Sequence, residues 1–69
     1  MTDNIHDWVK SEDAGYLPGK LLLDRAGGHW SVYRGNGRMW VAAWVVNSIC
    51  RRSATFRTRR EAVAHAEQN

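Results

Sequence analysis

Arginine is the residue type whose number and spacing in this chain could support chemistry. All eight arginines lie in residues 25–69 against two glutamates, a local charge of +6, whereas residues 1–24 carry five acids against two lysines, a charge of −3. Guanidinium groups offer a planar fork of donors that suits phosphates, guanine edges and carboxylates. Five of them fall within ten residues: Arg51, Arg52, Arg57, Arg59 and Arg60. This spacing favours contact with nucleic acid, although a GC-rich genome that encodes Arg in place of Lys would give the same composition.

Residues that could act in catalysis or bind a metal are scattered. Cys50 is the only cysteine and has no histidine or acid beside it in the sequence, and the two glycine-rich stretches at 27–28 and 35–37 do not lead into the Lys-Ser/Thr of a phosphate-binding loop. The three histidines fall in three different predicted elements: His6, His29 and His65. We therefore predict a protein that is not an enzyme and has no cofactor and no metal, with Cys50 as a small buried hydrophobe.

The length of 69 residues allows one domain, which buries only about 60% of the surface that its unfolded chain exposes. The longest apolar run, residues 39–46, is far shorter than the roughly 20 residues needed to span a bilayer. The first residues, Met-Thr-Asp-Asn, lack the pattern of a signal peptide. We expect a cytoplasmic protein of a bacterium or of a phage-infected cell, with no membrane partner.

The elements that must position these side chains can be traced along the chain. Apolar residues at Ile5, Trp8 and Val9 predict a short N-terminal helix, followed by a loop to residue 19 that contains a Pro18-Gly19 turn. This segment, 1–19, precedes a ββββα domain over 20–69. Its strands are predicted at 20–25, 29–34, 38–46 and 49–56.

The last element is a C-terminal helix. Thr58-Arg59-Arg60-Glu61 has the form of a capping box, in which Thr and Glu side chains each bond the other's backbone amide. The sequence therefore predicts an α+β fold: a three- to four-stranded antiparallel sheet packed against one C-terminal helix, with a short N-terminal helix in addition.

Two hairpin loops set the predicted faces of the sheet. A three-residue loop at 35–37 and a two-residue loop at 47–48 place Tyr33 opposite Met39 and Val45 opposite Cys50. This face is aliphatic and includes Val41, Ala54 and Phe56. We expect the C-terminal helix to pack on it through Ala62, Val63 and Ala66. The opposite face has apolar and polar members: Trp30, Val32, Trp40, Ala42, Trp44 and Ile49, with Arg34, Arg38, Arg51, Ser53 and Thr55 around them.

This second face, with Trp44 expected across from Arg51, has three open interpretations. The N-terminal segment, through Ile5, Trp8, Val9 and Leu17, could cover it and make the tryptophans core residues. It could instead be a recognition surface, or the interface of a homodimer.

The chain resembles the arm-type or AP2-like N-terminal DNA-binding domains of phage and transposon tyrosine integrases over roughly residues 20–67. The resemblance is carried by Trp-Ser-Val-Tyr-Arg at 30–34, the turn at 35–37, and Ala-Thr-Phe-Arg-Thr-Arg-Arg-Glu-Ala at 54–62. It implies three antiparallel strands whose face enters the DNA major groove, backed by one helix. It also implies groove-facing residues: Arg34, Trp40, Trp44, Arg51 and Ser53.

We therefore predict a small non-catalytic DNA-binding accessory protein of phage or mobile-element type. Duplex DNA is expected to meet the Trp/Arg face and the Arg-rich corner between the last strand and the helix. The predicted binding residues are Arg34, Arg38, Trp40, Trp44, Arg51, Ser53, Arg57, Arg59 and Arg60. The alternative is a phage-encoded module that engages a bacterial host protein, with toxicity to the host, or that homodimerises through the same tryptophans.

Overall fold

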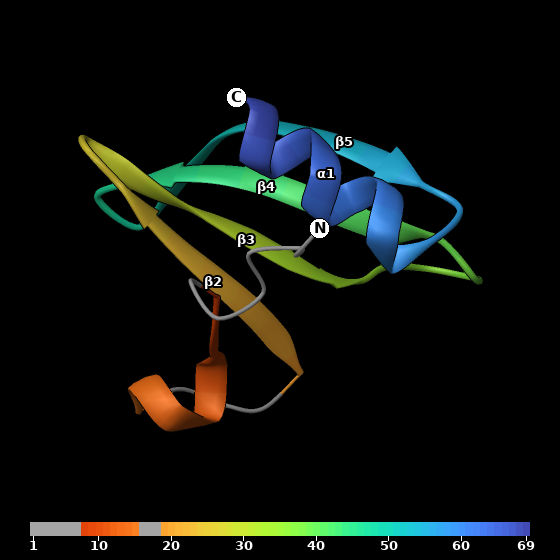
Figure 1. The fold of residues 1–69 in the computed structure, drawn as a ribbon, viewed down its shortest axis with the longest axis horizontal. Helices are drawn as coiled ribbons and strands as arrows, with labels where there is room; N and C mark the ends of the chain where they lie inside the picture. The colour runs from red at the N-terminus through yellow and green to blue at the C-terminus, as the bar shows by residue number, and fades with distance from the viewer. Residues whose placement is uncertain (1–7, 16–18) are drawn as a thin grey trace, which may run out of the picture.

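The computed structural model describes residues 8–15 and 19–69. One antiparallel sheet has the strand order β1-β2-β3-β4-β5, and one helix packs across a face of β3, β4 and β5 (Figure 1). The α+β fold with a C-terminal helix is thereby confirmed, with one strand more than predicted. The elements are β1 (Val9–Lys10), the 3-10 helix η2 (Ser11–Ala14), β2 (Lys20–Arg25), β3 (Gly28–Arg34), β4 (Trp40–Val46), β5 (Ile49–Phe56) and α1 (Arg59–Gln68).

The additional strand comes from the N-terminal part of the chain. In β1, Val9 pairs with Leu22 and Lys10 with Leu21 of β2. Residues 2–7 of the predicted N-terminal helix, and Pro18 of the predicted turn, lie outside the described residues, but Val9 and Lys10 belong to a strand and not to a helix. The preceding residue, Trp8, is 7% exposed, and its indole Nε1 donates to Glu67 Oε2 at 3.0 Å. This bond ties the start of the described chain to the last turn of α1.

The loop between β3 and β4 is longer than the predicted three residues. Arg34 pairs with Trp40, and the amide of Gly35 donates to the carbonyl of Met39 at 2.9 Å, so the loop spans residues 35–39. The predicted pairing of Tyr33 with Met39 is therefore wrong, since Tyr33 faces Val41. Because the shift is of two residues, and side chains alternate with a period of two, every residue of β4 keeps its predicted face.

The turn between β4 and β5 is the predicted two-residue loop. Asn47 and Ser48 both have positive φ, 51° and 67°, as a type I′ turn requires, and Val45 pairs with Cys50. Cys50 itself is exposed, which contradicts the prediction that it is buried. The reason is its place at the start of β5, an edge strand.

A β-bulge next to this turn overturns part of the predicted face assignment. The register shifts between Trp44 and Val45, so Trp44 pairs with Arg52 and the predicted pairing with Arg51 is wrong. A bulge inserts one residue into one strand, and a one-residue shift exchanges the two faces. Ala54 and Phe56 therefore share a face with the tryptophans, and Ser53 and Thr55 lie on the opposite one.

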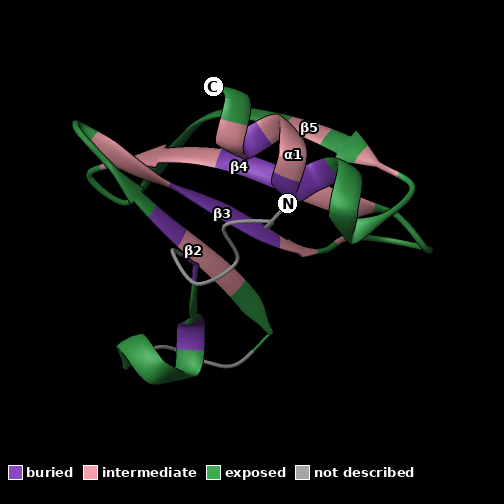
Figure 2. Ribbon diagram, viewed as in Figure 1, coloured by how far each residue is buried: buried purple, intermediate pink, exposed green. Residues whose placement is uncertain are grey.

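The core lies between α1 and the face that carries the tryptophans, whereas we predicted the helix on the other face. The indole of Trp30, 2% exposed, lies in this core with helix residues Ala62 and Ala66, each 0% exposed. Figure 2 shows the buried residues of α1 facing those of β3 and β4. Small helix residues allow the close approach that large indoles require. An indole buries about 150–250 Å², so at about 25 cal/mol/Å² Trp30 contributes on the order of 4–6 kcal/mol to folding. The buried cluster comprises Trp8, Leu23, Trp30, Val32, Ala42, Ala62, Val63 and Ala66.

The three interpretations of the tryptophan face can now be compared with this core. The face is covered mainly by α1, and Trp8 of the N-terminal segment packs in the same buried cluster. Val9 is 44% exposed and does not belong to the cluster, while Ile5 and Leu17 lie outside the described residues. Trp40 and Trp44 pack against the cluster but stay partly exposed.

Candidate functional site

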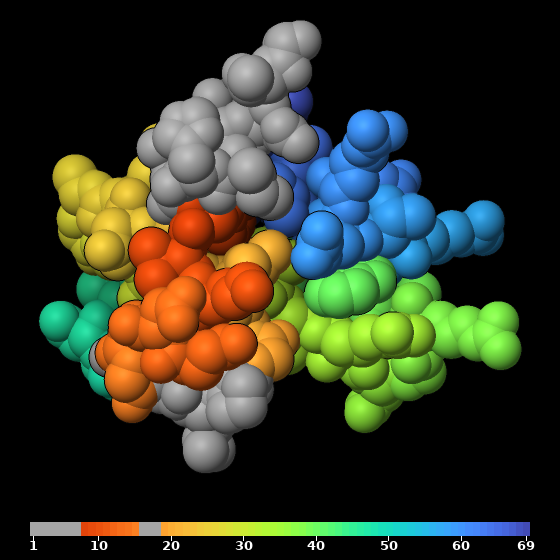
Figure 3. Space-filling view, turned by 60° about the horizontal axis from the view of Figure 1, so that its bottom comes forward, coloured from red at the N-terminus to blue at the C-terminus, as the bar shows by residue number. Residues whose placement is uncertain are grey.

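Five exposed arginines gather at one end of the sheet. The register places Arg34, Trp40 and Phe56 side by side across β3, β4 and β5. The chain leaves β5 through Arg57 and enters α1 at Arg59, so the β3–β4 loop and the β5–α1 corner lie at the same end (Figure 3). We call this group the arginine end, and its members are Arg34, Arg38, Arg57, Arg59 and Arg60.

The helix cap holds the corner of the arginine end in place. Glu61 N donates to Thr58 Oγ1 at 3.1 Å, and Thr58 N donates to Glu61 Oε1 at 3.2 Å. Both bonds of the predicted capping box are therefore present. Because they set the direction in which α1 leaves the sheet, they also position Arg59 and Arg60 in its first turn.

The arginine end is strongly positive. All five arginines are exposed, and Glu61 is the only acid within residues 34–40 and 57–61, which gives five positive charges against one. Among the described residues, no hydrogen bond or ion pair neutralises these guanidinium groups. Like charges held close together repel, and a polyanion would relieve that repulsion.

Trp40 supports one of these arginines. The guanidinium carbon of Arg34 lies 5.7 Å from the Trp40 ring centroid, a cation–π contact worth about 0.5–1 kcal/mol at an exposed site. Trp40 is partly buried and packs against the core. The Trp40 ring therefore contacts both Arg34 and the core. Through the contact with Arg34, it holds that guanidinium group in position.

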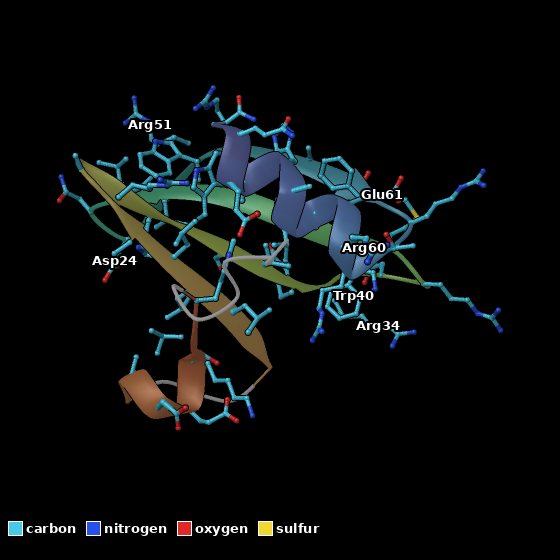
Figure 4. All side chains as sticks on the ribbon, in the orientation of Figure 1. Asp24, Arg34, Trp40, Arg51, Arg60 and Glu61 are labelled. Carbon is cyan, nitrogen blue, oxygen red and sulfur yellow. The ribbon has the colours of Figure 1, made fainter. Side chains whose placement is uncertain are left out.

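Three of the predicted binding residues lie elsewhere. Arg51 is at the opposite end of the molecule from Arg34 and Arg60 (Figure 4). Trp44 packs on Trp30 with ring centroids 5.4 Å apart. Ser53 is exposed on the face that α1 leaves open. The structure thus brings together six of the nine predicted residues and separates Trp44, Arg51 and Ser53 from them.

Lys20 is a charged residue near this end that the sequence analysis did not single out. It pairs with Tyr33, the neighbour of Arg34 in β3, and its Nζ lies 4.9 Å from the Tyr33 ring centroid. The signal that could have found it is the register of the β2–β3 hairpin. That register places Lys20 beside the end of β3 although it is far from the arginines in sequence.

Metal-binding groups and membrane-spanning helices were the other features that could occur in the described part of the chain. Across residues 8–15 and 19–69, no three His, Cys, Asp or Glu side chains are grouped so as to hold a metal ion. No helix within those ranges is long and apolar enough to cross a membrane. Comparisons with protein-family models, with curated proteins and with solved structures gave no match to this chain. The site geometry is therefore the basis on which a function can be proposed.

Proposed function

We propose that this protein binds duplex DNA through the arginine end. The observation that carries the proposal is the convergence of five exposed, unneutralised guanidinium groups from two segments that lie about twenty residues apart in sequence. Phosphate contacts of this kind supply most of the affinity of non-specific DNA binding. The start of α1 adds backbone amides and the positive end of the helix dipole beside Arg59 and Arg60.

The proposed mode of binding differs from the one that the integrase resemblance implies. There the sheet face enters the groove, whereas here the tryptophan face lies under α1 and Trp30 is 2% exposed. The opposite face presents apolar residues in its central strands and the carboxylate of Asp24. We therefore assign DNA contact to the end of the sheet, and the role of a non-catalytic accessory protein of phage or mobile-element type rests on the resemblance alone. Host-protein binding through the same tryptophans is not proposed, because α1 covers Trp30 and because Trp40 and Trp44 pack against the core.

The salt dependence of binding tests this proposal. Fluorescence anisotropy with a labelled 20-bp duplex should show affinity that falls steeply between 50 and 200 mM salt, with a slope of about 0.9 in log K against log salt for each phosphate contacted. Arg57→Gln should weaken binding at 50 mM salt and reduce that slope by about one contact. Arg51→Gln, an exposed arginine at the opposite end, is the matched control and should leave both quantities unchanged.

Two outcomes would overturn the proposal. The first is the absence of any anisotropy change at low salt with duplexes of several sequences. The second is an equal loss of affinity for Arg51→Gln and Arg57→Gln, which would show attraction by overall charge without a site.

A further inference from the structure

The sheet face opposite α1, which we call the open face, is hollow along its middle. The register aligns Leu22, Ser31 and Ala43 in a row across β2, β3 and β4 on this face. Ser31 and Ala43 are only 4% and 3% exposed, and both line a hollow that Ser11 and Ala14 of η2 border at one side. This hollow has a volume of about 930 Å³, is open to solvent, and is lined in part by Leu22, Tyr33 and Val45. A mostly apolar hollow of this size lies near the upper end of the range for ligand pockets, about 300–1,000 Å³, and is suited to a partner surface or a ligand.

A buried hydroxyl in this hollow lacks a partner. Ser31 lines the hollow, and its Oγ makes no hydrogen bond with any of the described residues. Leaving a buried polar group unsatisfied costs about 1–3 kcal/mol. A group that supplied a donor or acceptor from outside the chain would remove this cost.

Opposite charges stand at the two ends of the hollow. Lys20 and Asp24 lie on the same face of β2, one opposite Tyr33 and the other opposite His29, and both are exposed. Four residues of strand separate them by about 13 Å, so they do not pair within one chain. A partner that complements this face must therefore present an acid to Lys20 and a base to Asp24.

We propose that the occupant of the open face is a second copy of this chain, stacked face to face with its strands reversed. In a symmetric dimer every contact occurs twice, so Lys20 of each subunit meets Asp24 of the other. The two-fold axis then lies midway between the two sheets, runs across the strands, and passes over the row of Leu22, Ser31 and Ala43. Two sheets packed in this way lie about 10 Å apart and keep their strands within about 30° of each other.

The same arrangement supplies what the hollow lacks. Tyr33 and His29 flank Ser31 along β3, and reversal of the strands about this axis places the second copy's Tyr33 over His29 and its His29 over Tyr33, on either side of Ser31. Their ring hydroxyl and nitrogens are groups that can bond the Ser31 hydroxyl. The exposed side chain of Val9, at the end of the same row, is covered as well. A chain of 69 residues with one small core gains stability from such a partner.

Charge exchange tests the dimer. By sedimentation equilibrium, Lys20→Asp and Asp24→Lys should each raise the dimer dissociation constant at least tenfold (about 1.4 kcal/mol), because each places like charges together twice. The double variant carrying both substitutions should return the constant to near its original value. Lys10→Asp, an exposed lysine on the neighbouring strand whose side chain lies on the other face, is the control and should change nothing. Circular dichroism would confirm that each variant is folded.

A chain that stays monomeric at 1 mM overturns the inference, and so does a double variant that associates no better than the single ones. The inference does not rest on the proposed DNA binding. Arg57→Gln should leave the dimer unchanged, and Asp24→Lys should leave the salt slope of DNA binding within one contact of its original value, so the two proposals can fail separately.

Discussion

Two residues beside the arginine end, Thr58 and Trp40, hold parts of it in position. Thr58 sets the start of α1 through its bonds with Glu61, and Trp40 holds Arg34 through a cation–π contact. Arg25 plays a comparable part at the other end of the molecule, where its guanidinium donates to the carbonyl of Glu67 at 3.1 Å. The arginines thus differ in their contacts. Arg25 and Arg34 are held by other residues of the protein, whereas the guanidinium groups of Arg38, Arg57, Arg59 and Arg60 extend into solvent.

Removal of the helix cap should have a measurable effect on folding. Thr58→Ala loses the hydroxyl that accepts from Glu61 N, and the free energy of unfolding should fall by about 1 kcal/mol in urea denaturation. Thr58→Ser keeps the hydroxyl and should retain most of that stability. Equal losses for the two variants would show that the cap does not stabilise the fold.

At the scale of elements, the narrow face of α1 explains how one short helix closes the core. Ala62 and Ala66 contribute little volume of their own, and the indole of Trp30 fills the space beneath them. The bulge at Arg51 adds to this core, because it turns Ala54 and Phe56 of β5 toward the helix. Phe56 then meets the His65 ring of α1 at 5.1 Å between centroids.

This close packing predicts a sharp difference between two alanines of the same helix. Ala66→Leu forces extra methylene groups into a filled core and should lower the free energy of unfolding by about 1–3 kcal/mol. Ala64→Leu, at a partly exposed position, should change it by no more than about 0.5 kcal/mol. Thermal unfolding of both variants measures the difference. If Ala66→Leu is tolerated as well as Ala64→Leu, the helix does not pack on the sheet as described.

On the scale of the whole molecule, the two faces of the sheet differ in what covers them. One is closed by α1 and carries the tryptophans, while the other is open, with small residues at its centre and opposite charges at its ends. In the arginine end, Arg34 lies on the tryptophan face beside Trp40, and the other four arginines lie in the β3–β4 loop, the β5–α1 corner and the first turn of α1. A DNA contact at the end of the sheet and a dimer contact on the open face are therefore compatible in one protein.

The closed face predicts shielded tryptophans. Trp8 and Trp30 are 7% and 2% exposed, and Trp40 and Trp44 are partly buried. Quenching of tryptophan fluorescence by acrylamide, a neutral quencher, should be weak in the folded protein and rise several-fold in urea. Equal quenching in both states would contradict a core built on these indoles.

The local features of this fold could be predicted from the sequence. The capping box at Thr58, the two-residue turn at 47–48 and the bounds of β2 and β5 all depend on residues that are close together in the chain. Hydrogen bonds within four residues and a period of two are sufficient to determine them. The clustering of Arg57, Arg59 and Arg60 follows from the same local pattern.

Only the tertiary structure decided which face α1 covers, and with it the roles of the tryptophans and arginines. A single bulge at Arg51 reverses the faces of the rest of β5, and a loop two residues longer than predicted moves Arg34 beside Trp40. The direction in which the chain turns at Arg57 places the helix over Trp30 and not over Tyr33. These outcomes depend on how whole elements fill space against each other, which short-range preferences along the chain do not encode.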